Sequence, residues 1–166
     1  MTSADVAALI LRVAIGVCIF LHGANKWRTP ESRRGTAGWF GSIGMRRPTL
    51  QAAAAAFTEM IGGVLLVAGL VVPTAAGTVG STMVVAIVVA HRRNGFFIFN
   101  EGQGWEYCAI LLSMCVALGA LGGGKGSLDH ALGWEYSGNM GVVTTLIIVL
   151  VAPVIHLAVS YRPKAS

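Results

Sequence analysis

The stretch LQAAAAAFTEMIGGVLLVAGLVV, residues 50–72, decides the fold class of this chain. Glu59 is the single charged residue in it. Its length falls in the range of about 17–25 residues that a helix needs to cross about 30 Å of hydrocarbon. It lacks the alternation of apolar and polar residues that is typical of membrane β-strands. A membrane-spanning α-helix, which satisfies its backbone hydrogen bonds internally, is therefore predicted.

Four further apolar runs resemble this stretch in length, and they occupy residues 6–23, 74–90, 105–121 and 140–159. The chain of 166 residues is 55% hydrophobic and only 11% charged. Soluble domains carry about 25% charged residues, so this chain has too few to cover a soluble surface. We predict an all-α integral membrane protein built as a bundle of four or five transmembrane helices.

Positive charges follow the first, third and fifth apolar runs, and the opposite loops hold few. The basic residues on that side are Lys26, Arg28, Arg33, Arg34, Arg46, Arg47, Arg92, Arg93, Arg162 and Lys164. With five spans, the positive-inside rule places the N-terminus outside and the C-terminus in the cytoplasm. Because these residues flank spans and form no aromatic-interleaved patch, we expect contact with membrane lipids and no nucleic-acid partner.

Arg12 and Glu59 lie inside apolar runs, where an ionisable side chain is costly and marks a functional hypothesis. Counted from the ends of their runs, both lie roughly 14 Å deep. Glycines such as Gly16 and Gly63 share a helical face with them and permit close helix approach. We therefore expect a buried Arg12–Glu59 ion pair, for which a structural lock is favoured over a catalytic role.

A second group of polar residues is predicted near the cytoplasmic surface, namely His22, Lys26, His91 and Glu106, with His156 as a further member. One interpretation is an ordinary interface in which long side chains reach towards headgroups. The other is a polar pocket that exchanges protons with a quinone-like head group, because histidine titrates near neutral pH. On the fourth run, a stripe of Glu106, Ala109, Ile110, Ser113 and Ala117 is expected to face the bundle interior.

The sequence assigns no catalytic residue and no metal site. Cys18, Cys108 and Cys115 lie in apolar runs without zinc or CxxC spacing, which favours structural thiols. The histidines carry no further haem-ligand signature, so no haem is expected. No nucleophile elbow, phosphate loop, dinucleotide fingerprint or HExxH motif is present. The sequence therefore contains none of the motifs that these common forms of hydrolysis, phosphoryl transfer and nicotinamide binding require.

Six short pieces, in order, resemble the DoxX family, which is related to the membrane subunit of thiosulfate:quinone oxidoreductase. The pieces are Arg12 with HGANK (22–26), GWF (38–40) with Gly44, EMIGG (59–63) with its sequel to Leu70, His91 with GFF (95–97), GWEY (104–107), and Gly124 with GSLD (126–129). They cover roughly residues 8–133. The resemblance implies a four-helix core in the bacterial inner membrane, residues 1–136, with residues 137–166 as an additional transmembrane helix and basic tail.

The same resemblance implies a function and a set of site residues. The set carried over is Arg12, His22, Lys26, Glu59, His91 and Glu106. The implied role is a membrane subunit or partner of a quinone-linked redox complex, with electrons arriving from another protein because the chain has no redox cofactor motif. The alternative is a non-catalytic accessory or scaffold subunit of a larger membrane assembly. A small transporter is disfavoured because no repeat symmetry or broken helix is visible.

Overall fold

The computed structural model describes residues 1–163, and its regular structure is helical apart from one isolated β-bridge. The elements are α1 (Ser3–Trp27), α2 (Pro30–Ser42), α3 (Pro48–Ala68), α4 (Val72–Ala86), the π-turn η1 (Ile87–His91), the 3₁₀ turn η2 (Arg92–Asn94), α5 (Glu106–Leu121), α6 (Leu128–Leu132) and α7 (Gly138–Ser160). The all-α prediction is confirmed. Lys164, part of the predicted basic tail, lies outside the described residues.

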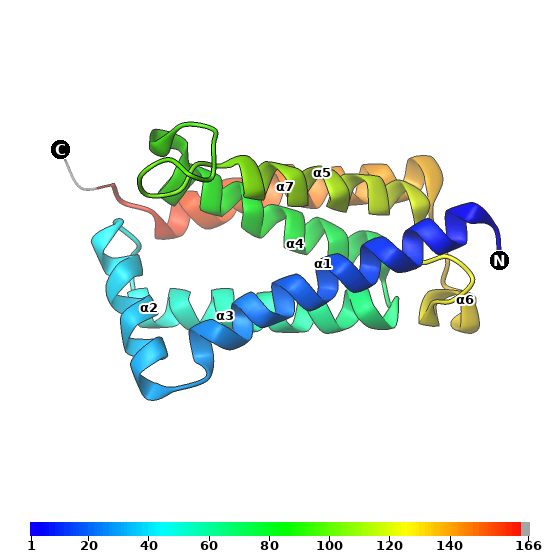
Figure 1. The fold of residues 1–166 in the computed structure, drawn as a ribbon, viewed down its shortest axis with the longest axis horizontal. Coiled ribbons are helices and arrows are strands. Elements are labelled where there is room, and N and C mark those ends of the chain that lie inside the picture. The colour runs from blue at the N-terminus through cyan, green and yellow to red at the C-terminus, as the bar shows by residue number, and fades with distance from the viewer. Residues whose placement is uncertain (164–166) are drawn as a thin grey trace.

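The helices α1, α3, α4, α5 and α7 run along the molecule, and α2 lies across one end of them (Figure 1). α1 packs against α3, and α4 packs against both α5 and α7. The N-terminus and the C-terminal end of α7 lie at opposite ends of the bundle (Figure 1). We call the end that carries α2 the α2 end, and the end that carries the short helix α6 the α6 end.

Within residues 1–163, four helical segments are long and apolar enough to cross a membrane, namely α1, α3, α7 and the continuous segment Val72–Asn94. α5 is apolar but has 16 residues, so it is only about 24 Å long. The helix expected as an addition, α7, is thus a full-length span, and α5 is the one that falls short of about 30 Å. The division of the chain at residue 136 stays a prediction, although α7 packs into the bundle, where the Thr145 hydroxyl donates to the Pro73 carbonyl at 2.9 Å.

The α1–α3 contact depends on the glycine stripes that the sequence indicated. A Cβ added to Gly16 would lie 2.7 Å from the Gly63 carbonyl oxygen, and one added to Gly23 would lie 2.6 Å from that of Ala56. Both distances are too short for a real carbon–oxygen contact, so glycine is required for this spacing. Lipid does not drive apolar helices together as water does, and close backbone packing of this kind stabilises the pair.

The predicted inward face of α5 is wrong. Its buried residues are Cys108, Leu111, Cys115, Leu118 and Gly119. The stripe that contains Ile110, Ser113 and Ala117 is exposed on the outer side of the helix. α5 is apolar all round, so polarity cannot separate a lipid-facing side from a core-facing side.

The basic loop between the first two apolar runs contains a helix that the sequence analysis missed. Thr29 caps α2, since its hydroxyl accepts from the Ser32 backbone N–H at 3.1 Å and its own backbone N–H donates to the Ser32 hydroxyl at 3.0 Å. Pro30 occupies the first helical position, where its missing N–H costs nothing. The Thr29–Pro30 pair is the local signal that would have predicted this helix.

Candidate functional site

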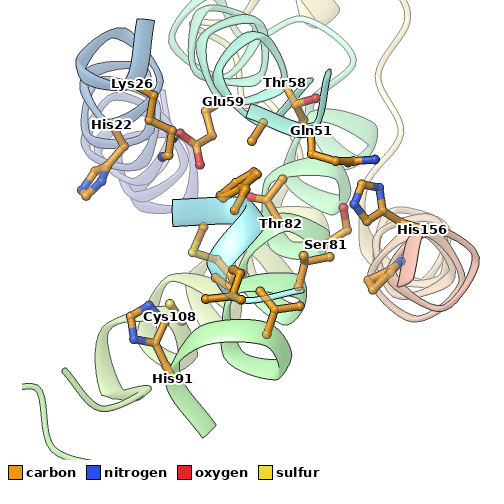
Figure 2. A pocket seen from close by; sticks show the side chains of 18 of the residues that line it. His22, Lys26, Gln51, Thr58, Glu59, Ser81, Thr82, His91, Cys108 and His156 are labelled. Atoms are coloured by element: carbon orange, nitrogen blue, oxygen red, sulfur yellow. Dashed lines mark hydrogen bonds and ion pairs between the residues drawn. The ribbon is translucent and has the colours of Figure 1, made fainter. Parts of the chain in front are cut away.

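A cavity of about 510 Å³ opens at the α2 end of the bundle. Residues from α1, α2, α3, α4, η1, α5 and α7 line it, and most of the lining is apolar. Figure 2 shows the polar side chains that project from these helices around the cavity. Those relevant to chemistry are His22, Lys26, Glu59, His91, Tyr107 and His156. The structure therefore brings three of the four residues of the predicted pocket to one cavity, with His156 beside them.

The charged feature of the cavity is an ion pair between Lys26 and Glu59. The Lys26 Nζ atom lies 2.5 Å from Glu59 Oε2. The Glu59 side chain is 9% exposed and that of Lys26 is 23% exposed, so the pair is largely removed from water. Burial in low dielectric strengthens the attraction between the charges and makes either partner costly to leave alone.

The predicted Arg12–Glu59 ion pair is wrong. Lys26 occupies the position beside Glu59, and it lies 14 residues further along α1 than Arg12. That separation is about 21 Å along a helix, too far for an Arg12 side chain to reach. The depth calculation failed because the ends of the two runs are not level. Gly23, the last residue of the first run, packs against Ala56, which lies about 9 Å inside the second run.

Arg12 instead lies at the α6 end, where it is fully buried. Its Nη1 donates to the carbonyls of Leu66 and Val67 at 3.3 and 3.1 Å, and its Nη2 donates to Gly126 at 2.9 Å. The last carbonyls of a helix lack intrahelical partners and carry partial negative charge. Arg12 therefore satisfies the C-terminus of α3, which is a structural role remote from the cavity.

Asp129 completes the polar network at the α6 end, and sequence reasoning gave it no role. Its side chain is buried and accepts from the backbone N–H groups of Val71 at 2.6 Å and Val72 at 2.8 Å. These are unsatisfied donors at the N-terminus of α4, where a carboxylate is favoured. The residue before α4 is Val71, whose side chain cannot cap a helix. This missing cap is the sequence feature that would have predicted a carboxylate from elsewhere in the chain.

A chain of three polar side chains runs along the α1–α5 edge of the cavity. The Tyr107 hydroxyl lies 3.2 Å from His22 Nε2 and 2.8 Å from Cys18 Sγ. Tyr107 and Cys108 line the cavity. Cys18 does not line it and is connected to it by the hydrogen bond with Tyr107. The sequence analysis singled out His22, whereas Tyr107 entered it only as part of the GWEY piece.

His91 and Glu106 have different roles from each other. His91 ends the π-turn η1, and because a carbonyl only accepts, its Nδ1 donates to the Gln103 carbonyl at 2.9 Å. Glu106 does not line the cavity. Its Oε2 accepts from the Ile98 backbone N–H at 3.0 Å, which braces the loop that precedes α5. A π-turn within a helix is frequently found at a functional site.

These features define a small helical membrane protein with a mostly apolar cavity and a cluster of hydrogen-bond donors at one end. The sequence model of the DoxX family matches residues 7–92, and the chain belongs to that family. Over 116 residues it is 34% identical to a Bacillus subtilis (strain 168) protein named "Putative oxidoreductase CatD", which covers 70% of this chain and 81% of CatD. No solved structure matches the chain.

Proposed function

We propose that this protein is the membrane component of a quinone-linked redox system and binds the quinone head group in the α2-end cavity. The observation that carries the proposal is the coincidence of an apolar cavity with the Lys26–Glu59 pair and the His22–Tyr107 hydrogen bond. The name of the Bacillus relative, an oxidoreductase, supports the redox class.

The cavity has the size and the donor set that a quinone ring needs. Its volume of about 510 Å³ falls within the range of about 300–1,000 Å³ that is usual for small-molecule sites. A quinone offers two carbonyl oxygens, which accept hydrogen bonds, on an otherwise apolar ring. The Lys26 ammonium and the Tyr107 hydroxyl are donors on the cavity wall, and residues such as Ile19 and Met83 supply the apolar contact.

Reduction of a quinone to a quinol takes two electrons and two protons. In our proposal, an electron-donating protein partner supplies the electrons, since the chain offers no redox cofactor motif. His22 and Tyr107 supply a path for protons, because imidazole and phenol groups in direct hydrogen-bond contact can pass a proton along. Glu59 holds the Lys26 ammonium against the cavity wall, which positions a cation where negative charge develops on the quinone oxygen.

The orientation in the membrane is part of the same proposal. The segments that hold the basic side chains, from Lys26 to Arg47, at Arg92 and Arg93, and at Arg162, gather at the α2 end (Figure 1). The positive-inside rule supports placing this end on the cytoplasmic face of a bacterial inner membrane, with the N-terminus outside. The cavity then opens towards cytoplasmic electron donors.

Photoaffinity labelling tests the proposal directly. The full-length protein in lipid nanodiscs is irradiated with an azido-quinone, and the modified peptides are identified by mass spectrometry. We expect labelling of cavity-lining peptides of α3, α4 and α5, reduced by excess unlabelled quinone. Tyr107→Phe should lower the labelled fraction about threefold to tenfold through the lost hydrogen bond. Tyr136→Phe, which removes a hydroxyl bound to Thr74 at the other end, should leave it unchanged.

The alternative function is a non-catalytic scaffold in a larger membrane assembly. The buried Arg12 and Asp129 network favours this reading for the α6 end, because its hydrogen bonds satisfy the ends of helices α3 and α4. Labelling that excess quinone fails to reduce, or that spreads evenly over the lipid-facing helix surfaces, would contradict quinone binding and leave the scaffold function.

A further inference from the structure

A second cavity, of about 210 Å³, lies beside the first at the α2 end. Its polar wall consists of Ser42, Arg92, Arg93 and Tyr161, and its apolar wall includes Ile43 and Val88. The two arginines stand at the end of the membrane-length segment Val72–Asn94. The cavity is therefore at the boundary between hydrocarbon and headgroups.

The wall that contains Tyr161 is held in place by backbone hydrogen bonds to the loop between α2 and α3. Tyr161 forms an antiparallel bridge with Met45. The Arg162 N–H donates to the Gly44 carbonyl at 2.8 Å, and the Arg46 N–H donates to the Ser160 carbonyl at 2.8 Å. The C-terminal segment thus forms part of the cavity wall at a fixed position.

The charge in this cavity is not compensated within residues 1–163. The ion pairs of that range join Lys26 with Glu59, Arg34 with Glu31, and His130 with Glu135, and none includes Arg92 or Arg93. The guanidinium group presents a planar set of donors that suits phosphate oxygens. Two unpaired guanidiniums and a phenol around one small cavity therefore favour an anion.

We propose that this cavity binds the phosphate group of an anionic phospholipid. Arg92 and Arg93 supply the positive charge, the Tyr161 hydroxyl supplies a further donor, and Ile43 and Val88 contact the first carbons of the acyl chains. A lipid is favoured over a soluble anion because the cavity has an apolar wall at the membrane boundary, where basic pockets between helices hold anionic headgroups. The assignment does not depend on quinone binding.

The ligand would also affect the first cavity, because Ile43 and Val89 line both. A phospholipid in the second cavity lies against the wall that separates the two. Its presence would therefore fix the end of α2 and the π-turn η1 that border the quinone cavity.

Native mass spectrometry of the full-length protein tests this inference with defined lipids. The protein is purified in a mild detergent, and phosphatidylglycerol or phosphatidylcholine of matched acyl chains is added. We expect one phosphatidylglycerol to be retained in preference to phosphatidylcholine. The double variant R92Q/R93Q should reduce that retention by roughly 30-fold, because each arginine near an anionic headgroup strengthens binding. Tyr161→Phe should reduce it less.

R33Q/R34Q is the matched control, since it removes two arginines at the same end that do not line the cavity. We expect it to retain phosphatidylglycerol as wild type does. Equal loss in R33Q/R34Q and R92Q/R93Q would replace a defined site with general surface attraction and overturn the proposal. Full retention in R92Q/R93Q would also overturn it. Displacement of the lipid by millimolar inorganic phosphate would assign the site to a soluble anion instead.

Discussion

Asp129→Asn is the substitution that probes the polar network of the α6 end most sharply. Asp129 is 1% exposed. Its carboxylate accepts two backbone N–H groups at 2.6 and 2.8 Å, one of them from Val71. Val71 has φ 46°, a left-handed conformation that is rare for a β-branched residue and persists only where its surroundings enforce it. Asparagine has nearly the same size but only one side-chain acceptor atom.

The expected loss of stability follows from these contacts. A hydrogen bond to a charged group contributes about 1.5–3 kcal/mol, and a buried donor left without a partner costs about 1–3 kcal/mol. Replacing one carboxylate oxygen by an NH₂ group leaves one N–H of α4 facing a donor and removes a charge from the helix N-terminus. We expect a destabilisation of about 2–4 kcal/mol, which corresponds to a fall in Tm of roughly 4–16 °C.

The assay is thermal unfolding of the purified protein in one mild detergent, followed by tryptophan fluorescence. Asp5→Asn is the control, because Asp5 is a more exposed carboxylate at the same end that bonds the Lys125 N–H at 3.0 Å. Its Tm should fall by less. If Asp129→Asn unfolds at the wild-type temperature, the carboxylate does not hold α4 and our description of the network is wrong.

Three further outcomes are expected. Gly63→Leu should lower the yield of folded monomer, measured by size-exclusion chromatography, because the added Cβ would lie 2.5 Å from a carbonyl oxygen of α1. Gly35→Leu, which has open space around it, should leave the yield unchanged. Equal yields of the two variants would contradict the close α1–α3 contact. Under the proposed topology, Lys125→Cys in a cysteine-free background should react with an impermeant maleimide in intact cells, and Arg34→Cys only after permeabilisation; the reverse pattern would invert the orientation. Glu106→Gln should speed hydrogen exchange in the loop before α5 and leave quinone binding unchanged; lost binding would place Glu106 in the site.

The long apolar runs were sufficient to predict an all-helical membrane protein, and the helix faces of α1 and α3 were predicted because their glycines recur at helical spacing. Arg12 and Gly16 are indeed buried on α1, and Glu59 and Gly63 are buried on α3. The face of α5 could not be predicted in this way, since lipid and protein interior are similarly apolar. In a membrane helix, small residues indicate a contact only where a partner helix offers a matching face.

The candidate site was predicted in part. His22, Lys26 and His91 meet at one cavity because α1 and the continuous segment Val72–Asn94 both reach the α2 end. Glu59 joins them through Lys26, whereas Arg12 belongs to the opposite end. Arg12 could not be placed from residue counts alone, since its partners are backbone carbonyls, which have no signature in the sequence. Tyr107 was missed for a related reason, because its role depends on the approach of α5 to α1.

The most direct test of the quinone proposal is equilibrium binding of menadione to the protein in nanodiscs, measured by titration calorimetry. Ala152 lines the cavity on α7, and Ala158 of the same helix is exposed outside it. We predict saturable binding of one menadione per chain, weakened by about tenfold or more in Ala152→Phe, which fills the cavity, and unchanged in Ala158→Phe. Absence of saturable binding to the wild-type protein, or equal affinity in both variants, would contradict a quinone site in this cavity.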